Sequence, residues 1–454
     1  MSNPFALHGT LIHTLSPTEV EHIEDALLIV DKDGRIDQLE RSVSADAVPE
    51  HLRNYAANNL IPVRYLKRGE FIIPGFVDTH NHAPQWAMRG LGRGLQILDW
   101  LEKVTFANEA KFKDPAYARK IYSSCVDGFI KQGITTASYY ASLHGEATKI
   151  LADICLSKGQ RALVGKCCMD RNGADFYVEE NADRSLRDTR DVIEHIRKID
   201  PTANLVAPVL TPRFAICCDE ELMTGLGNIV KKDPGIAIQT HFNEARSEIS
   251  ATLSLFPEFK NEADLYHHYN LLTRHSILAH CCHIEEYEIE KLKEYDCGVA
   301  HCPISNVTVG GGFMAAPIRK FLQKGIKVGL GTDSGGGFSS SILDAMRQAF
   351  IVSNAREMMT EGAEASLTAH ECFYLATLGG AKVCSLNDKV GNFEVGKEFD
   401  GLLINVVDED LEGATTMIED QDPLDVMFEK FLMTGDDSNI TKVWIKGRLV
   451  KDVT

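Results

Sequence analysis

The sequence has little positive charge, with 47 Lys and Arg residues against 65 Asp and Glu residues and a net charge of −18 in 454 residues. No cluster of Lys or Arg offsets this balance, so nucleic acids and acidic membrane headgroups are disfavoured as partners because their phosphates would be repelled. Uninterrupted apolar runs are short, and Ala26 to Val30 is far below the roughly 18 residues of a membrane-spanning helix. The first residues also lack the basic start and long apolar stretch of an export signal. These absences argue against nucleic-acid-binding, membrane and secreted classes of protein.

The chain has 12 cysteines but no CxxC motif. Six of the cysteines form three adjacent pairs: Cys167 with Cys168, Cys217 with Cys218, and Cys281 with Cys282. In a long chain without an export signal, free and mostly buried thiols are favoured over disulfides. This cysteine usage predicts a cytoplasmic location.

Short apolar runs alternate with amphipathic helical stretches through the middle of the chain. Eight runs occur, at residues 71–80, 134–140, 161–169, 204–211, 236–241, 276–281, 298–302 and 327–333. Helical patterns such as those at 184–199 and 284–295 separate most of them. This alternation predicts an α/β protein with a (β/α)8 TIM-type barrel. A doubly wound open sheet is the alternative, although it normally needs fewer strands.

The two ends of the chain have a different pattern. Residues 27–39 are two apolar runs joined through Asp-Lys-Asp-Gly, which indicates a hairpin, and residues 396–406 and 440–453 return to the same style. We expect both ends to pair into one small β-sandwich domain. The predicted division is 1–71 and 381–454 for this domain and 72–380 for the barrel.

Histidines and an aspartate lie where the predicted strands end. His80 and His82 close the first run, and residues two apart in a strand point to the same side. His241 ends the fifth run, His280 the sixth and Asp333 the eighth. The carboxyl ends of barrel strands form the catalytic face, and imidazoles with a carboxylate suit a borderline divalent ion such as zinc. The sequence therefore predicts a metal site.

The same positions indicate a hydrolase. A divalent ion lowers the pKa of bound water to about 7, and Asp333 is placed to accept the proton of that water. Glu244 follows His241 by three residues and is suited to pass a proton to the substrate. His280 is placed either to bind the metal or to hydrogen-bond the developing charge. Together these groups predict hydrolytic attack on an electrophilic carbon.

The motifs PGFVDTHNH, HFNE, AHC and GTD, in this order, resemble the amidohydrolase superfamily. Within it the whole chain resembles the guanine deaminase family, through DTHNHAPQ, LDWLEKVTFANEAKF, GITTASYYAS, GQRALVGKCCMD, TPRF, LATLGGA and VGNFEVGKEFDGLLIN. The resemblance implies a homodimeric enzyme of purine catabolism that converts guanine and water to xanthine and ammonia. It also implies one zinc ion per subunit, and the ligand types suit iron as well.

Carried over by position, the resemblance assigns the site residues. Four residues would bind zinc: His80, His82, His241 and Asp333. Three would be catalytic, Glu244 and Asp333 as proton carriers and His280 as an assistant. Three would contact guanine: Gln85, Arg213 and Phe214. The last assignment is chemically sensible, because Arg213 donates to a carbonyl oxygen, an amide both donates and accepts, and Phe214 can stack on a purine.

Two residues depart from the family pattern, Asn81 and Trp86. We expect Asn81 to point away from the metal, where its amide needs a partner, and Trp86 to alter the shape of the pocket. The stretch AHCPISN, with His301 and Cys302, is interpreted as a buried strand end, and Cys302 and the paired cysteines as packing residues.

Two other functions are compatible with these residues. One is a related amidohydrolase that deaminates a pterin, a triazine or another aminated heterocycle. The other is a catalytically silent barrel that acts as a scaffold, although such proteins usually lose metal ligands. A different class of zinc deaminase has an H-x-E motif followed by P-C-x-x-C. H-x-E occurs at residues 144–146 and 283–285, but no P-C-x-x-C motif follows either one, so this class is excluded.

Overall fold

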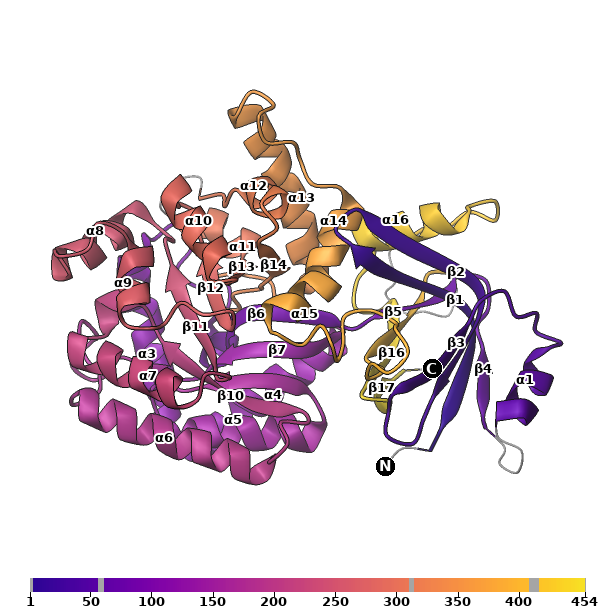
Figure 1. Cartoon of the computed structure of the whole chain (residues 1–454), viewed down its shortest axis with the longest axis horizontal. Coiled ribbons are helices and arrows are strands. Elements are labelled where there is room, and N and C mark those ends of the chain that lie inside the picture. The colour runs from indigo at the N-terminus through magenta and orange to yellow at the C-terminus, as the bar shows by residue number, and fades with distance from the viewer. Residues whose placement is uncertain (1–2, 56–60, 310–313, 408–415, 454) are drawn as a thin grey trace.

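The computed structural model describes residues 3–55, 61–309, 314–407 and 416–453, which form a barrel and a separate sheet (Figure 1). The barrel consists of parallel strands, and each strand pairs with the next one along the chain. These strands are β6 (Phe76–His82), β7 (Ile134–Tyr140), β8 (Arg161–Gly165), β10 (Val206–Pro212), β11 (Ala237–Phe242), β12 (Ser276–His280), β13 (Gly298–His301) and β14 (Lys327–Leu330). The short β9 (Cys167–Cys168) pairs with β10.

Hydrogen bonds between the first and last strand regions close the barrel. The Thr79 hydroxyl donates to the Leu330 carbonyl at 2.8 Å, and the Asp333 amide donates to the His80 carbonyl at 2.8 Å. The predicted eight-stranded barrel is therefore confirmed, and the open sheet is excluded.

Helices surround the barrel because each buries one apolar side against the strands. In α6, for example, Leu186, Val192 and Ile196 are buried while the opposite side is charged. The longer helices are α4 (Pro115–Lys131), α5 (Gly145–Lys158), α6 (Ala182–Ile199), α7 (Glu220–Lys232), α8 (Arg246–Leu255), α10 (Glu286–Glu294) and α13 (Ile342–Met359). Shorter ones are α2 (Ile97–Trp100), α3 (Phe106–Glu109), α9 (Glu262–His268), α11 (Pro303–Thr308), α12 (Ile318–Gln323), α14 (Ala369–Tyr374) and α15 (Gly380–Val383).

Strands from both ends of the chain form the second sheet. Its order is β17 (Arg448–Asp452), β16 (Ile440–Ile445), β15 (Gly401–Asn405), β5 (Glu70–Pro74), β1 (Phe5–Ser16), β2 (Glu19–Val30) and β3 (Ile36–Glu40), with β4 (Val63–Tyr65) on β1. The helices α1 (Val48–Tyr55) and α16 (Leu424–Thr434) accompany it. The rings of Phe5, Phe399 and Trp444 pack together and join the two ends. The prediction of one β domain from both ends is confirmed, although the domain limits at 71 and 380 stay a prediction.

One predicted strand, 71–80, is in fact two strands that belong to different sheets. The chain leaves β5 and enters β6 at Gly75, whose amide donates to the Asp400 carbonyl at 3.0 Å. A Cβ at this glycine would lie 2.2 Å from the Thr135 hydroxyl oxygen, so no larger residue fits. The prediction was wrong here because one apolar run spans both strands.

All twelve cysteines are free and buried, as the sequence predicts. In the described part of the chain, no helix combines the length and the apolar character needed to cross a bilayer.

Candidate active site and metal centre

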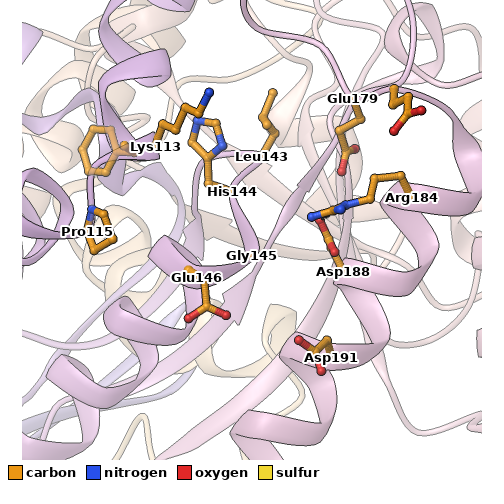
Figure 2. A pocket seen from close by; sticks show the side chains of 12 residues that line it. Lys113, Pro115, Leu143, His144, Gly145, Glu146, Glu179, Arg184, Asp188 and Asp191 are labelled. Carbon is orange, nitrogen blue, oxygen red and sulfur yellow. Dashed lines mark hydrogen bonds and ion pairs between the residues drawn. The ribbon is translucent and has the colours of Figure 1, made fainter.

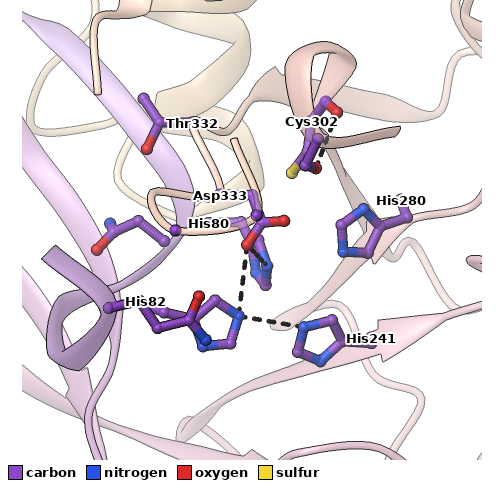
Figure 3. A network of polar contacts seen from close by, with 12 residues as sticks. His80, His82, His241, His280, Cys302, Thr332 and Asp333 are labelled. Carbon is purple, nitrogen blue, oxygen red and sulfur yellow. Dashed lines mark hydrogen bonds and ion pairs between the residues drawn. The ribbon is translucent and has the colours of Figure 1, made fainter. Parts of the chain in front are cut away.

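Five side chains converge at the carboxyl ends of the barrel strands, and Figure 3 shows them turned toward one another. His80 Nε2 lies 3.3 Å from the nearer Asp333 oxygen, and His82 Nε2 lies 3.5 Å from the same oxygen. The Nε2 atoms of His82 and His241 are 3.2 Å apart. Two groups have ligand atoms that all lie within 4.8 Å of one another: His80 with His241 and His280, and His80 with His82 and Asp333.

Hydrogen bonds behind the cluster fix the ring orientation of two histidines. The Nδ1 atom of His241 donates to the Arg213 carbonyl at 2.6 Å, and that of His280 donates to the Asn306 side-chain oxygen at 2.8 Å. Each ring therefore turns an unprotonated Nε2 toward the cluster, as metal-binding histidines do. The Nδ1 atom of His80 is buried without a hydrogen-bond partner among the described residues, and its Nε2 faces the Asp333 carboxylate. These donors fit a bound divalent ion.

The electrostatics of the cluster also suit a metal. Burial, together with the neighbouring imidazoles, holds the pKa values of His82 and His241 well below the usual range, so both rings stay neutral. For Asp333, burial alone would raise the pKa, but the hydrogen bond with His80 and the electrostatic interaction with the imidazoles of His80, His82 and His280 lower it well below its usual value. Neutral imidazole and ionised carboxylate are the forms that bind metals.

Unusual backbone conformations aim these side chains inward. His280, Cys281 and Asp333 have φ angles of 77°, 50° and 42°, in the left-handed region that non-glycine residues seldom adopt. Each such residue costs about 1–3 kcal/mol, which the surrounding fold must offset. Strain of this kind is concentrated at functional sites.

Glu244 lies beside the cluster, with Oε2 3.7 Å from His280 Nε2. The side chain is buried, and burial is the main reason that its pKa is raised. A carboxyl group that holds its proton nearer to neutral pH is suited to give that proton to a substrate.

A narrow cavity of about 20 Å³ lies above the cluster. Gln85, Arg213 and Phe214 all line it, so the structure brings the three predicted substrate contacts together with the metal cluster. The remaining lining residues are His82, Ile97, Trp100, Leu101, His241, Glu244, Val309, Asp333 and Gly336. The apolar wall from α2 and the following turn gives the cavity the mixed character typical of a site for a flat, partly polar ligand.

Sequence reasoning missed Glu109, a buried residue behind this cavity. Its carboxylate accepts hydrogen bonds from Arg213 Nη1 at 2.7 Å and from Gln85 Nε2 at 2.8 Å. Glu109 lies in the stretch LDWLEKVTFANEAKF, which contributes to the family resemblance. The resemblance assigns no role to any residue of this stretch. Proximity in the fold, rather than spacing in the chain, brings Glu109 to these two residues.

The two departures from the family pattern both lie outside the cavity lining. The Asn81 amide donates to the Ser138 carbonyl at 3.2 Å, so it points into the barrel wall as expected. The Trp86 indole donates to the Ser124 hydroxyl at 3.1 Å, and its ring packs beneath Arg89 and against α4. Because Trp86 faces α4, it does not shape the pocket directly. His301 and Cys302 are buried at the end of β13, as interpreted, and neither belongs to a possible metal group of the described residues.

A second cavity of about 470 Å³ lies between α4, α5 and α6 (Figure 2). It is rich in carboxylates, but most of them have cationic partners, such as Arg184 for Asp188 at 2.9 Å and Lys149 for Asp191 at 2.6 Å. No group of three possible metal ligands occurs there among the described residues. The chemistry is therefore concentrated in the cavity above the histidines.

Known proteins resemble the chain over nearly its whole length. The sequence profile of the amidohydrolase family matches residues 71–450. The chain is 42% identical to the probable guanine deaminase of Schizosaccharomyces pombe, over 97% of this chain and 82% of that protein. It is 39% identical to the guanine deaminase of Homo sapiens, over 97% and 95%.

A solved structure agrees with these sequence matches. The crystal structure of guanine deaminase from C. acetobutylicum with bound guanine in the active site superposes with a TM-score of 0.87 at 32% identity, over 98% of this chain and all of that one. Together with the family match over most of the chain, these similarities show that the chain belongs to the amidohydrolase family.

Proposed function

We propose that this chain is a guanine deaminase that converts guanine and water to xanthine and ammonia. The observation that carries the proposal is the placement of Gln85, Arg213 and Phe214 around one cavity whose floor is the histidine–aspartate cluster. The similarity to a protein whose structure holds guanine in its active site supports this substrate.

His80, His82, His241 and Asp333 are the proposed ligands of one divalent ion. Three imidazoles with one carboxylate favour zinc, although iron accepts the same ligands. Such an ion supplies hydroxide at neutral pH by lowering the pKa of bound water to about 7. His80, His82 and Asp333 are buried and His241 is half-buried, so bulk water has little access to these four side chains.

The chain's own groups then carry out the proton transfers. Arg213 and Gln85 hold the polar edges of the purine, and Phe214 packs against its ring. Glu244 protonates the ring nitrogen next to the carbon that bears the amine, which makes that carbon more electrophilic. Asp333 takes a proton from the attacking water and returns it to the departing amine, so that ammonia leaves. His280 accepts a hydrogen bond from the attacking water through Nε2, and Asn306 holds its ring in place.

The proposal includes three broader properties. A homodimer follows from the family resemblance, and size-exclusion chromatography with light scattering tests it. A cytosolic location is supported by the twelve free thiols, since reducing conditions preserve them. Zinc is tested by elemental analysis of the purified protein.

The decisive experiment follows guanine by ultraviolet absorbance and ammonia by a coupled assay, with purified, zinc-loaded protein. Conversion of guanine with one ammonia per turnover is expected. Faster turnover of a pterin or triazine in the same assay would favour a related aminohydrolase. Absence of turnover on all these compounds, with little metal bound in both the wild type and His241→Ala, would favour the silent scaffold.

A further inference from the structure

Glu109 is a buried charged residue that the mechanism above does not use. It ends α3 and is 1% exposed. Its carboxylate holds two proposed purine contacts at once: Gln85 Nε2 donates to Oε1 at 2.8 Å, while Arg213 donates through Nη1 to Oε2 at 2.7 Å and through Nη2 to Oε1 at 3.3 Å. One side chain therefore connects both polar walls of the cavity.

This contact fixes which way the Gln85 amide faces. An ionised carboxylate can only accept hydrogen bonds, so Gln85 must turn its NH2 group toward Glu109. The amide oxygen is then left as an acceptor, and it is buried with no hydrogen-bond partner among the described residues. A buried acceptor without a partner is costly, so an N–H group of the ligand is its natural complement. Gly335 leaves room for this oxygen, because a Cβ there would lie 2.0 Å from it.

Glu109 also compensates the charge of Arg213. Arg213 is 2% exposed, and its guanidinium lines the same cavity as the proposed metal ligands His82, His241 and Asp333. Burial alone would lower the pKa of Arg213, but the charge of Glu109 raises it well above its usual value. The Phe106 ring lies 5.4 Å from the guanidinium carbon and limits its movement. The paired guanidinium can therefore donate to a neutral ligand from a fixed position.

We propose that Glu109 is a positioning residue that sets the donor and acceptor pattern of the purine site. It holds Gln85 as an acceptor and Arg213 as a donor, so the cavity selects a purine edge that offers an N–H group to Gln85 and a carbonyl oxygen to Arg213. A purine with an unprotonated ring nitrogen opposite Gln85 is disfavoured, because two acceptors then face each other. This inference rests on the proposed guanine deaminase activity.

Glu109→Gln tests the proposal with little change of shape. Because the new amide can donate as well as accept, Gln85 is no longer held in one orientation. We expect KM for guanine to rise about 10-fold or more, as for the loss of a charge-assisted hydrogen bond, while kcat changes less and the bound metal per chain stays the same. Glu109→Asp keeps an acceptor-only group and should recover part of the loss. If Glu109→Gln does not fold, Glu109→Asp alone decides, with an expected rise in KM of at least about 3-fold.

Two further variants separate positioning from general destabilisation. Glu398→Gln removes a buried carboxylate that pairs with Arg161 at the start of β8, away from the cavity, and should leave KM unchanged. Combining Glu109→Gln with Gln85→Ala should raise KM by less than the product of the single effects, because the two residues act together.

The outcomes distinguish the two proposals. If the wild type does not deaminate guanine, the proposed function and this inference both fall. If the wild type is active but the Glu109 variants have KM values within twofold of it, or if the effects of Glu109→Gln and Gln85→Ala simply multiply, only this inference is overturned.

Discussion

Replacing Glu244 with Gln removes one ionisable proton from the cavity and keeps the size of the side chain. Glu244 is 4% exposed, so it has little contact with bulk water that could replace it as a proton donor. A positioned general acid contributes about 10²–10⁴-fold to the rate. At about 1.36 kcal/mol for each factor of ten, Glu244→Gln should raise the barrier by about 2.7–5.4 kcal/mol. We expect this loss in kcat, with KM changed by less than about 3-fold because the proposed purine contacts remain.

Steady-state kinetics on guanine at pH 7 give both constants, and elemental analysis gives the metal content of each preparation. Glu248→Gln is the matched control, since it also removes a buried carboxyl but lies on α8, outside the residues that line the cavity. Its kcat should stay close to that of the wild type. A kcat for Glu244→Gln within tenfold of the wild type, at full metal content, would refute the role of Glu244 as the acid. Loss of metal from Glu244→Gln would instead make it a ligand.

Three further predictions concern the metal, the pH dependence and the junction between the two parts of the chain. His241→Ala should weaken metal binding more than about 100-fold, because loss of a residue that only hydrogen-bonds to a metal ligand already lowers metal affinity by about 10–100-fold. Full zinc occupancy of the variant in a dialysis titration would contradict this. Burial raises the pKa of Glu248 to about 7, and burial together with the charge of Glu248 raises the pKa of Glu262. The folded state therefore keeps a proton on this pair of carboxyl groups that the unfolded chain releases above about pH 4.3. The free energy of unfolding of the wild type should therefore fall as the pH rises from about 4.3 through the folded pKa values. Between pH 5 and 7, the free energy of unfolding of Glu248→Gln should rise relative to that of the wild type by up to about 1.4 kcal/mol for each pH unit. If urea titrations give the same difference between the two proteins at pH 5 and at pH 7, this prediction is wrong. Arg161→Ala leaves Asp400, 3.0 Å from the guanidinium, as an uncompensated buried charge and should lower the free energy of unfolding by about 3–5 kcal/mol in urea titrations, whereas a loss below about 1 kcal/mol would show that the pair is dispensable.

The barrel and the metal cluster could be predicted because their signals are local. Each strand is a short apolar run, and His241, His280 and Asp333 come at the ends of such runs, so the topology of a parallel barrel brings them to one face. The change of sheet at Gly75 could not be predicted, because apolar periodicity continues across it. Only the packing of Thr135 and the hydrogen bond to Asp400 distinguish the two strands.

Glu109 and Trp86 show the other limit of sequence reasoning. A glutamate in a short amphipathic stretch usually faces solvent, and nothing local indicates that Glu109 is buried against Arg213. Trp86 follows a predicted substrate contact, which suggested a place in the pocket, yet the 3-10 turn after His82 directs it toward α4. In both cases the partner lies far along the chain, and short-range patterns carry no information about it.

The arrangement of the terminal sheet has a consequence for how the chain is made. β5 lies between β1 and β15, so one of its edges is completed only by a strand near the other end of the chain. During synthesis at about 5–20 residues per second, β15 emerges roughly 15–65 s after β5. Throughout that interval the apolar strand Glu70–Pro74 offers unpaired backbone groups to any other nascent chain. Ribosomal stalling or a premature stop before Gly401 would therefore produce a chain that already contains the proposed metal ligands but aggregates through β5.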